Sequence, residues 1–237
     1  MSSLKKRLAQ HIYSNMGFLP GLIVLLIFTV QPGKKMPSTY TLLCLGDSYT
    51  IGESVSSNEN FPSQTVQLLR KTGHDFEKPE IIAKTGWTTA ELQDAINRHS
   101  FRKSYDFVTL LIGVNNQYRG IAVENYKPQF ESLLKQAIQF ANGNTEHVIV
   151  LSIPDWGVTP FAKDRDQKKI AEEIDAYNKA NRQMAEQYKV HYLDITPGTR
   201  KAVADPSFIS SDSLHPSVKE YAQWAEKLSI MIQLELK

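Results

Sequence analysis

The chain has 237 residues, of which 41% are hydrophobic and 22% are charged. This length and composition predict one globular domain with a sizeable core. The single cysteine, Cys44, excludes an internal disulfide and a cysteine-rich zinc site. Because Cys44 lies within the apolar run YTLLCLG, we expect a buried strand residue and not a reactive thiol.

The formal net charge of +2 comes from the beginning of the chain. Residues 1–35 contain five basic residues and no acidic residue, which leaves 22 basic and 25 acidic residues in the rest. A mildly acidic domain lacks the concentration of Lys and Arg on which nucleic-acid binding depends. We therefore expect no nucleic-acid partner.

Residues 1–35 also differ from the rest in pattern. A basic KKR precedes the apolar run GFLPGLIVLLIFTV at 17–30, which is short for a membrane-spanning helix and has the length of a signal-peptide core. No small-residue cleavage site follows. Three interpretations stay open: membrane association through 17–30, export, or an upstream extension with translation starting at Met36, which would leave the protein in the cytoplasm. We predict an N-terminal extension over 1–35 and one folded domain over 36–237.

After residue 36, apolar runs alternate with amphipathic stretches. The apolar runs predict strands at 40–45, 105–113, 147–154 and 190–195, and the stretch at 80–86 predicts a short strand followed by a loop. Helical periodicity and helix-start signals predict helices at 60–71, 88–98, 123–140, 165–188 and 216–234. This alternation, with strands that read as continuous apolar runs, predicts an α/β fold in which helices cover both faces of a parallel sheet.

In open α/β sheets, ligands bind beyond the carboxyl ends of the strands. This rule selects the loops at 46–54, 84–88, 113–120, 154–161 and 195–215. The sequence contains no P-loop, no G-x-G-x-x-G after the first strand and no H-E-x-x-H. Nucleotide binding and zinc-dependent chemistry are therefore unsupported, and we expect neither a cofactor nor a metal.

The first of these loops, LGDSYTIGES, presents Ser48 directly after a strand, and the last contains Asp212 and His215 just before a helix. Pro216 suits the first turn of that helix, so His215 stands at its entrance. An aspartate three residues earlier can hold imidazole Nδ1 and leave Nε2 free to take a proton from a hydroxyl. The alternative is ordinary turn chemistry for all three residues.

Two further loops offer hydrogen-bond donors for a developing oxyanion. Asn115 and Asn116 follow the third expected strand, and Gly86 follows the second. A side-chain amide and an unhindered backbone N–H at this edge could stabilise the negative charge. The alternative is again turn formation, for which Asn and Gly are well suited.

Taken in order, GDS at 46–48, Gly86, GVNN at 113–116 and DSLH at 212–215 resemble the SGNH, or GDSL-type, hydrolases. The resemblance spans about residues 40–232. It implies a flavodoxin-like three-layer α/β/α sandwich with a five-stranded, mainly parallel sheet. It also implies a cofactor-independent esterase that cleaves carboxylic esters through an acyl-enzyme intermediate.

The resemblance assigns roles to five residues. It implies that Ser48 is the nucleophile, His215 the general base and acid, and Asp212 the residue that orients His215. The oxyanion donors would be the backbone N–H groups of Ser48 and Gly86 and the side chain of Asn115.

The chain departs from the family pattern at two positions. Lys84 stands where many members have Asn, and Asn116 where many have Asp. These departures make it unsafe to transfer a substrate from better-known relatives. Acetylated sugars, short-chain esters, lysophospholipids and thioesters all stay open, and the leading hypothesis is a short-chain acyl ester or a lysophospholipid. A substrate pocket is predicted from Trp87, Asn116, Tyr118, Trp156 and Phe161, with core packing or solvated loops as the alternative.

The competing hypothesis is a non-catalytic protein of the same fold that binds a carbohydrate or a lipid head group. The complete set of Ser48, Asp212 and His215 argues against it, because a binding protein has no need of all three.

Overall fold

The computed structural model describes residues 39–236, so the predicted extension over 1–35 and its apolar run at 17–30 lie outside the described residues. Five strands form one sheet: β1 (Leu42–Asp47), β2 (Glu80–Lys84), β3 (Phe107–Leu111), β4 (Val148–Leu151) and β5 (His191–Leu193). Their order is β2-β1-β3-β4-β5, and each neighbouring pair is parallel. The predicted α/β fold is confirmed, and its sheet is parallel throughout.

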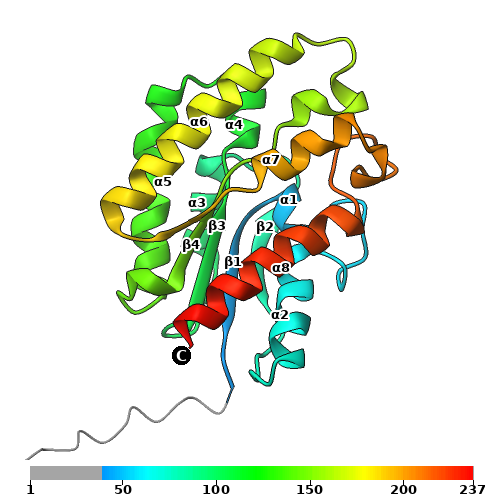
Figure 1. Ribbon diagram of the computed structural model, residues 1–237. Coiled ribbons are helices and arrows are strands. Elements are labelled where there is room, and N and C mark those ends of the chain that lie inside the picture. Colours follow the sequence, from blue (N-terminus) through cyan, green and yellow to red (C-terminus); the bar gives the residue numbers. More distant parts are fainter. Residues whose placement is uncertain (1–38, 237) are drawn as a thin grey trace, which may run out of the picture. The chain divides into compact units, whose positions relative to one another are not determined.

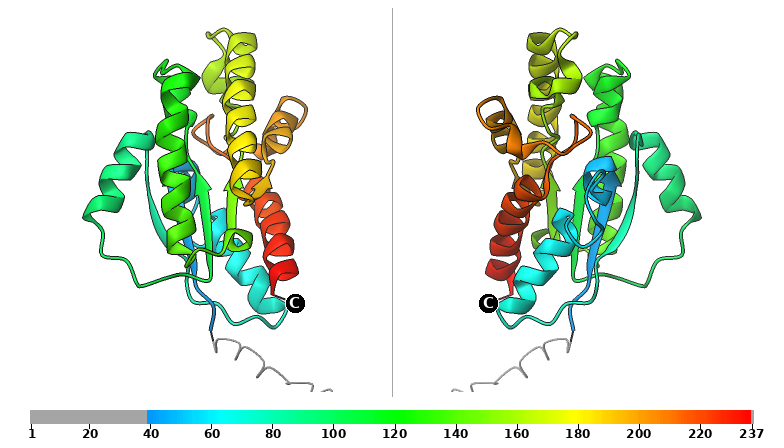
Figure 2. Two further views of the ribbon diagram at one scale, coloured as in Figure 1. Left: turned by 90° about the vertical axis from the view of Figure 1, so that its left-hand side faces the viewer. Right: turned by 90° about the vertical axis from the view of Figure 1, so that its right-hand side faces the viewer.

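Five long helices connect or follow the strands (Figure 1). They are α2 (Phe61–Lys71), α3 (Thr89–Arg98), α5 (Val123–Phe140), α6 (Gln167–Tyr188) and α8 (Val218–Glu235). The crossover from β1 to β2 runs in the opposite direction to the other crossovers, and parallel crossovers are right-handed. Figure 2 accordingly shows α2 and α8 on one side of the sheet and α3 and α5 on the other.

Side-chain caps explain where the predicted helices begin. Asn60 accepts a hydrogen bond from the Ser63 N–H at the start of α2. Thr88 and Glu91 form a capping box at the start of α3. The boundaries of α5 agree with the predicted 123–140. The strand β1 begins and ends two residues later than the predicted 40–45, and the other four strands are shorter than predicted. Within residues 39–236, no helix combines the length and apolar character that crossing a bilayer requires.

Three short helices lie in segments predicted as loops: α1 (Ser48–Ile51), α4 (Val114–Tyr118) and α7 (Thr196–Thr199). All three follow the carboxyl end of a strand. Asp47 starts α1 by accepting a hydrogen bond from the Tyr49 N–H at 3.0 Å. The loop containing Ser48 is therefore a helical turn with a defined geometry.

Aromatic side chains of the core pack helix α2 against helix α8. Phe61 of α2 packs against Tyr221 and Trp224 of α8, with ring centroids 6.5 and 5.9 Å away.

Cys44 is fully buried in β1, and burial raises the pKa of its thiol to about 12. The thiol is therefore protonated and inert, as the sequence predicted.

Gly113 fixes the turn from β3 into α4. Its φ angle is +131°, and a Cβ atom there would lie 2.7 Å from the hydroxyl oxygen of Tyr126. That hydroxyl is buried, 3.0 Å from the carbonyl oxygen of Ile112 and 2.8 Å from Asn181 Oδ1. Only a glycine allows both the backbone angle and the approach of Tyr126.

We expect Gly113→Ala to lower the free energy of unfolding by more than about 2 kcal/mol, because it combines backbone strain with a steric clash. Gly143→Ala is the matched control, since Gly143 also has a positive φ of +81° but a Cβ atom there would meet nothing within 4 Å. The control is expected to cost only about 1 kcal/mol. Urea denaturation of both variants measures the difference, and equal losses would contradict the steric argument.

Candidate active site

Ser48 stands at the junction of β1 and α1, at the carboxyl edge of the sheet. A Cβ atom on Gly46 would lie 2.0 Å from Thr50 Oγ1 and 2.6 Å from the carbonyl oxygen of Leu111. Glycine at 46 therefore lets the α1 turn fold back against β1 and β3. This close packing holds Ser48 nearly buried, with 3% of its surface exposed.

His215 and Asp212 meet Ser48 as predicted. His215 Nε2 lies 2.9 Å from Ser48 Oγ, and His215 Nδ1 lies 2.6 Å from Asp212 Oδ2. A carboxylate only accepts hydrogen bonds, so the proton of neutral imidazole belongs on Nδ1. Nε2 then accepts the hydrogen bond of the Ser48 hydroxyl, which is the arrangement needed to remove its proton.

Asp212 is held in the ionised form that this arrangement needs. Burial opposes its ionisation, but hydrogen bonds from the Ser54 hydroxyl, the His215 ring and the N–H groups of His215 and Leu214 together lower the pKa of Asp212 well below its usual range. Ser210 Oγ adds a further hydrogen bond at 2.8 Å. The carboxylate is therefore charged throughout the neutral pH range.

The loops that contain Gly86 and Asn115 face Ser48 across one cavity. Gly86 has a φ of +80° and lies in a turn in which the Trp87 N–H donates to the Lys84 carbonyl at 3.3 Å. Asn115 Nδ2 donates to the Trp87 carbonyl at 3.0 Å. Because an amide nitrogen carries two hydrogens, this contact leaves one for another acceptor.

Arg119 fixes the same turn from outside the cavity. Its Nη2 donates to the Gly86 carbonyl at 2.6 Å, and its Nη1 lies 3.3 Å from Glu91 Oε1. Since Glu91 also caps α3, the turn is tied to the start of that helix.

A cavity of about 180 Å³ connects these groups with an apolar wall. Three predicted pocket residues, Tyr118, Trp156 and Phe161, line it. Tyr118 is 5.2 Å from Trp156 between ring centroids, and Trp156 is 6.0 Å from Phe161. The tips of this aromatic wall, Tyr118 and Phe161, are exposed.

Four lining residues were not predicted from the sequence: Tyr49, Thr85, Val114 and Leu214. Each directly precedes or follows a residue assigned to the site. That adjacency was the available signal, because a loop that carries one residue to the sheet edge carries its neighbours too.

Two predicted pocket residues do not line the cavity. Asn116 is fully buried, and its side chain accepts a hydrogen bond from the Thr89 N–H at 3.0 Å and donates to Thr89 Oγ1 at 2.8 Å. It therefore ties α4 to the first residue of α3. Trp87 is partly buried against the core, and only its carbonyl oxygen contacts the site, through Asn115.

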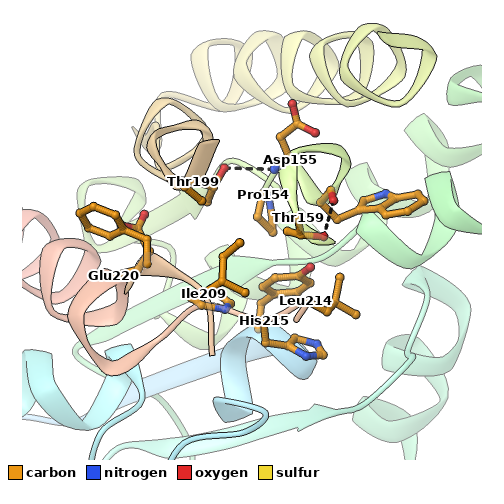
Figure 3. A pocket seen from close by; sticks show the side chains of 13 residues that line it. Pro154, Asp155, Thr159, Thr199, Ile209, Leu214, His215 and Glu220 are labelled. Carbon is orange, nitrogen blue, oxygen red and sulfur yellow. Dashed lines mark hydrogen bonds between the residues drawn. The ribbon is translucent and has the colours of Figure 1, made fainter. Parts of the chain in front are cut away.

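A second cavity of about 20 Å³ adjoins the first and shares four lining residues with it, Tyr49, Trp156, Leu214 and His215 (Figure 3). This volume is close to that of one water molecule. Figure 3 shows the Asp155 carboxylate directed away from His215, and Arg200 Nε donates to it at 2.8 Å. The Asp155 carboxylate therefore pairs with Arg200 and not with His215.

Asp47 is a buried carboxyl group beneath the nucleophile. Its Oδ1 caps α1, and among the described residues its Oδ2 has no hydrogen-bond partner. Burial raises the pKa of Asp47 to about 7, from an ordinary value of 3.8. The polar groups around Ser48 thus include one carboxyl that is neutral in mild acid.

The doubly wound α/β domain aligns a serine, a histidine and an aspartate at the carboxyl edge of its sheet, which is the edge where such folds bind ligands. Residues 44–223 match the GDSL-like Lipase/Acylhydrolase family, and the chain belongs to this family. The predicted family is confirmed, and with it an esterase-type hydrolase.

Solved structures of similar fold cover most of the chain. Axe2, an acetylxylan esterase from Geobacillus stearothermophilus, matches with a TM-score of 0.65 and 18% identity, over 81% of this chain and 94% of that chain. TesA matches with a TM-score of 0.65 and 18% identity, over 81% and 97%. A lipase/acylhydrolase from Enterococcus faecalis matches with a TM-score of 0.61 and 20% identity, over 83% and 95%. No curated protein sequence matches the chain.

We expect Asp47→Asn to change how stability depends on pH. The folded state raises the pKa of Asp47 from 3.8 to about 7, so it favours the protonated form. The stability that this provides is complete below the unfolded pKa and is lost as the pH rises through about 7. An asparagine keeps the acceptor for the Tyr49 N–H and cannot ionise.

Urea denaturation of wild type and Asp47→Asn at pH 5 and pH 8 measures the effect. The variant is expected to gain more than about 1 kcal/mol relative to wild type between these two pH values. Parallel pH dependence in the two proteins would contradict a neutral Asp47.

Proposed function

We propose that this protein hydrolyses carboxylic esters with Ser48 as nucleophile, His215 as general base and acid, and Asp212 as the residue that orients His215. The proposal rests above all on the hydrogen-bonded chain from Ser48 Oγ to His215 Nε2, at 2.9 Å, and from His215 Nδ1 to Asp212 Oδ2, at 2.6 Å. Ser48 and His215 of this hydrogen-bonded series line a cavity that Gly86 and Asn115 also line.

The reaction proceeds in two stages. Ser48 Oγ attacks the ester carbonyl carbon while its proton passes to His215 Nε2. The N–H groups of Ser48 and Gly86 and the Asn115 amide stabilise the oxyanion. The C–O bond to the alcohol breaks, and the alcohol leaves with the proton from His215. A water molecule then attacks the acyl-enzyme and gives one proton to His215 Nε2. The bond between Ser48 Oγ and the acyl carbon breaks, the proton passes from His215 to Ser48 Oγ, and the acid is released.

The cavity favours a neutral, apolar acyl group. Apart from the polar groups of the proposed catalytic machinery and Thr85, its lining is aromatic or aliphatic. Its volume of about 180 Å³ is similar to an apolar cavity of ~150 Å³ that accepts benzene. We propose a short-chain acyl ester as the substrate. The acyl chain of a lysophospholipid would have to extend past the exposed rings of Tyr118 and Phe161.

The non-catalytic alternative explains less of the geometry. A carbohydrate- or lipid-binding protein gives no role to the alignment of His215 with Ser48, or to an aspartate held ionised by five hydrogen-bond donors from Ser54, Ser210, Leu214 and His215.

We expect Ser48→Ala to reduce the hydrolysis of p-nitrophenyl acetate at least about a thousandfold, because the acyl-enzyme can no longer form. Ser132→Ala is the matched control, since Ser132 is exposed on α5. The control is expected to keep the wild-type rate. Equal rates for wild type and Ser48→Ala would instead favour the non-catalytic alternative.

We expect Phe161→Ala to change the preference for acyl length. Removing the ring takes away part of the apolar wall that a six-carbon chain contacts and an acetyl group does not reach. The kcat/KM for p-nitrophenyl hexanoate should fall about fivefold, whereas that for the acetate should stay within about twofold. Val203→Ala is the control, because Val203 is exposed and lies outside this cavity. Equal losses for both esters would contradict the assigned wall.

A further inference from the structure

Backbone strain is concentrated next to the proposed catalytic aspartate. Four residues other than glycine have a positive φ within the described residues: Ser54, Asn142, Lys189 and Ser213. Ser213 directly follows Asp212, and the side chain of Ser54 contacts Asp212. A positive φ costs a residue with a side chain about 1 kcal/mol or more, and such strain persists where the surrounding structure enforces it.

Ser54 makes a hydrogen bond unlike the others at Asp212. The Ser54 hydroxyl donates to Asp212 Oδ2 at 2.6 Å, and this is the oxygen that receives His215 Nδ1, also at 2.6 Å. The donors to Oδ1 all come from Ser210, Leu214 and His215, in the same segment as the aspartate. Among the described residues, Ser54 is therefore the one hydrogen-bond donor to Asp212 from a different part of the chain.

The backbone before Ser54 is anchored to the nucleophile. The N–H groups of Gly52 and Glu53 both donate to the Ser48 carbonyl, at 3.1 and 3.0 Å. Gly52 turns the chain with a φ of +79°, and a Cβ atom there would lie 2.5 Å from Asn60 Cβ. A short, rigid path therefore leads from the backbone of Ser48 to the hydroxyl of Ser54.

The residue before Ser54 reaches the third loop of the site. Glu53 accepts a hydrogen bond from the Thr85 hydroxyl, next to Gly86. The Glu53-Ser54 dipeptide thus contacts both the loop with the proposed oxyanion donor and the loop with Asp212.

We propose that Ser54 is a positioning residue that holds Asp212 Oδ2 in line with His215 Nδ1, and thereby aims His215 Nε2 at Ser48. This inference rests on the proposed function. The side chain of Asp212 is 29% exposed, so water reaches it and competes for its oxygen atoms. The Ser54 hydroxyl occupies the second acceptor site of Oδ2 and restricts rotation of the carboxylate, at the cost of local backbone strain.

Two variants at this position separate positioning from stability. Ser54→Gly removes the hydroxyl, so kcat should fall about tenfold with KM unchanged. Its melting temperature should change little, because relief of the backbone strain offsets the lost hydrogen bond. Ser54→Thr keeps the hydroxyl but places a β-branched residue at positive φ, so its melting temperature should fall while kcat stays within about twofold. Lys189→Gly relieves similar strain at a φ of 56° at the end of α6, and should raise the melting temperature without changing kcat.

A spectroscopic measurement needs no substrate. The proton on His215 Nδ1, hydrogen-bonded to a carboxylate, should give a far-downfield proton resonance in NMR spectra of the full chain. We expect this resonance to shift or broaden in Ser54→Gly and to persist in Ser54→Thr and Lys189→Gly. Its behaviour tests the role of Ser54 even if the ester substrate is wrong, and Ser48→Ala tests the ester hydrolysis separately.

The proposal is overturned if Ser54→Thr loses activity while Ser54→Gly keeps it. It is also overturned if the resonance in Ser54→Gly is unchanged, even where kcat falls. A loss of kcat and an altered resonance in Ser54→Gly, with both retained in Ser54→Thr, support it.

Discussion

The hydrogen bond between His215 and Ser48 joins two residues that are 167 positions apart along the chain. Ser48 begins the turn that leads towards α2, and His215 lies just before α8. These two helices pack through Phe61, Tyr221 and Trp224. A shift of α8 along α2 would carry the His215 imidazole away from the Ser48 hydroxyl. The aromatic core between these helices therefore supports the proposed chemistry.

Two aspartates near Ser48 show how the surroundings control charge. Asp47 is buried with one oxygen lacking a partner among the described residues, and burial raises its pKa to about 7. Asp212 is partly exposed, and its hydrogen-bond donors outweigh burial and lower its pKa. The same type of side chain therefore has two roles. Asp47 is a helix cap that is neutral in mild acid, and Asp212 is a fixed negative charge.

The sequence predicted the order of strands and helices because long apolar and amphipathic runs carry a clear period. It also predicted the meeting of Ser48, Asp212 and His215, because parallel strands bring their carboxyl ends to one edge. The turns α1, α4 and α7 escaped prediction because each is at most five residues long, too short for a period. Asn116 was misplaced because an amide after a strand can face a cavity or cap a neighbouring helix, and only the position of Thr89 decides between them.

The segment after β4 carries Trp156 and Phe161 but none of the residues proposed for catalysis. It is attached to the segment of Asp212 and His215 by a hydrogen bond between backbone atoms, from the Phe161 N–H to the Ser213 carbonyl at 3.0 Å. Side chains at 156 and 161 can therefore be exchanged while this attachment is preserved. Evolution can accordingly alter the range of acids that the protein accepts separately from the chemistry that releases them.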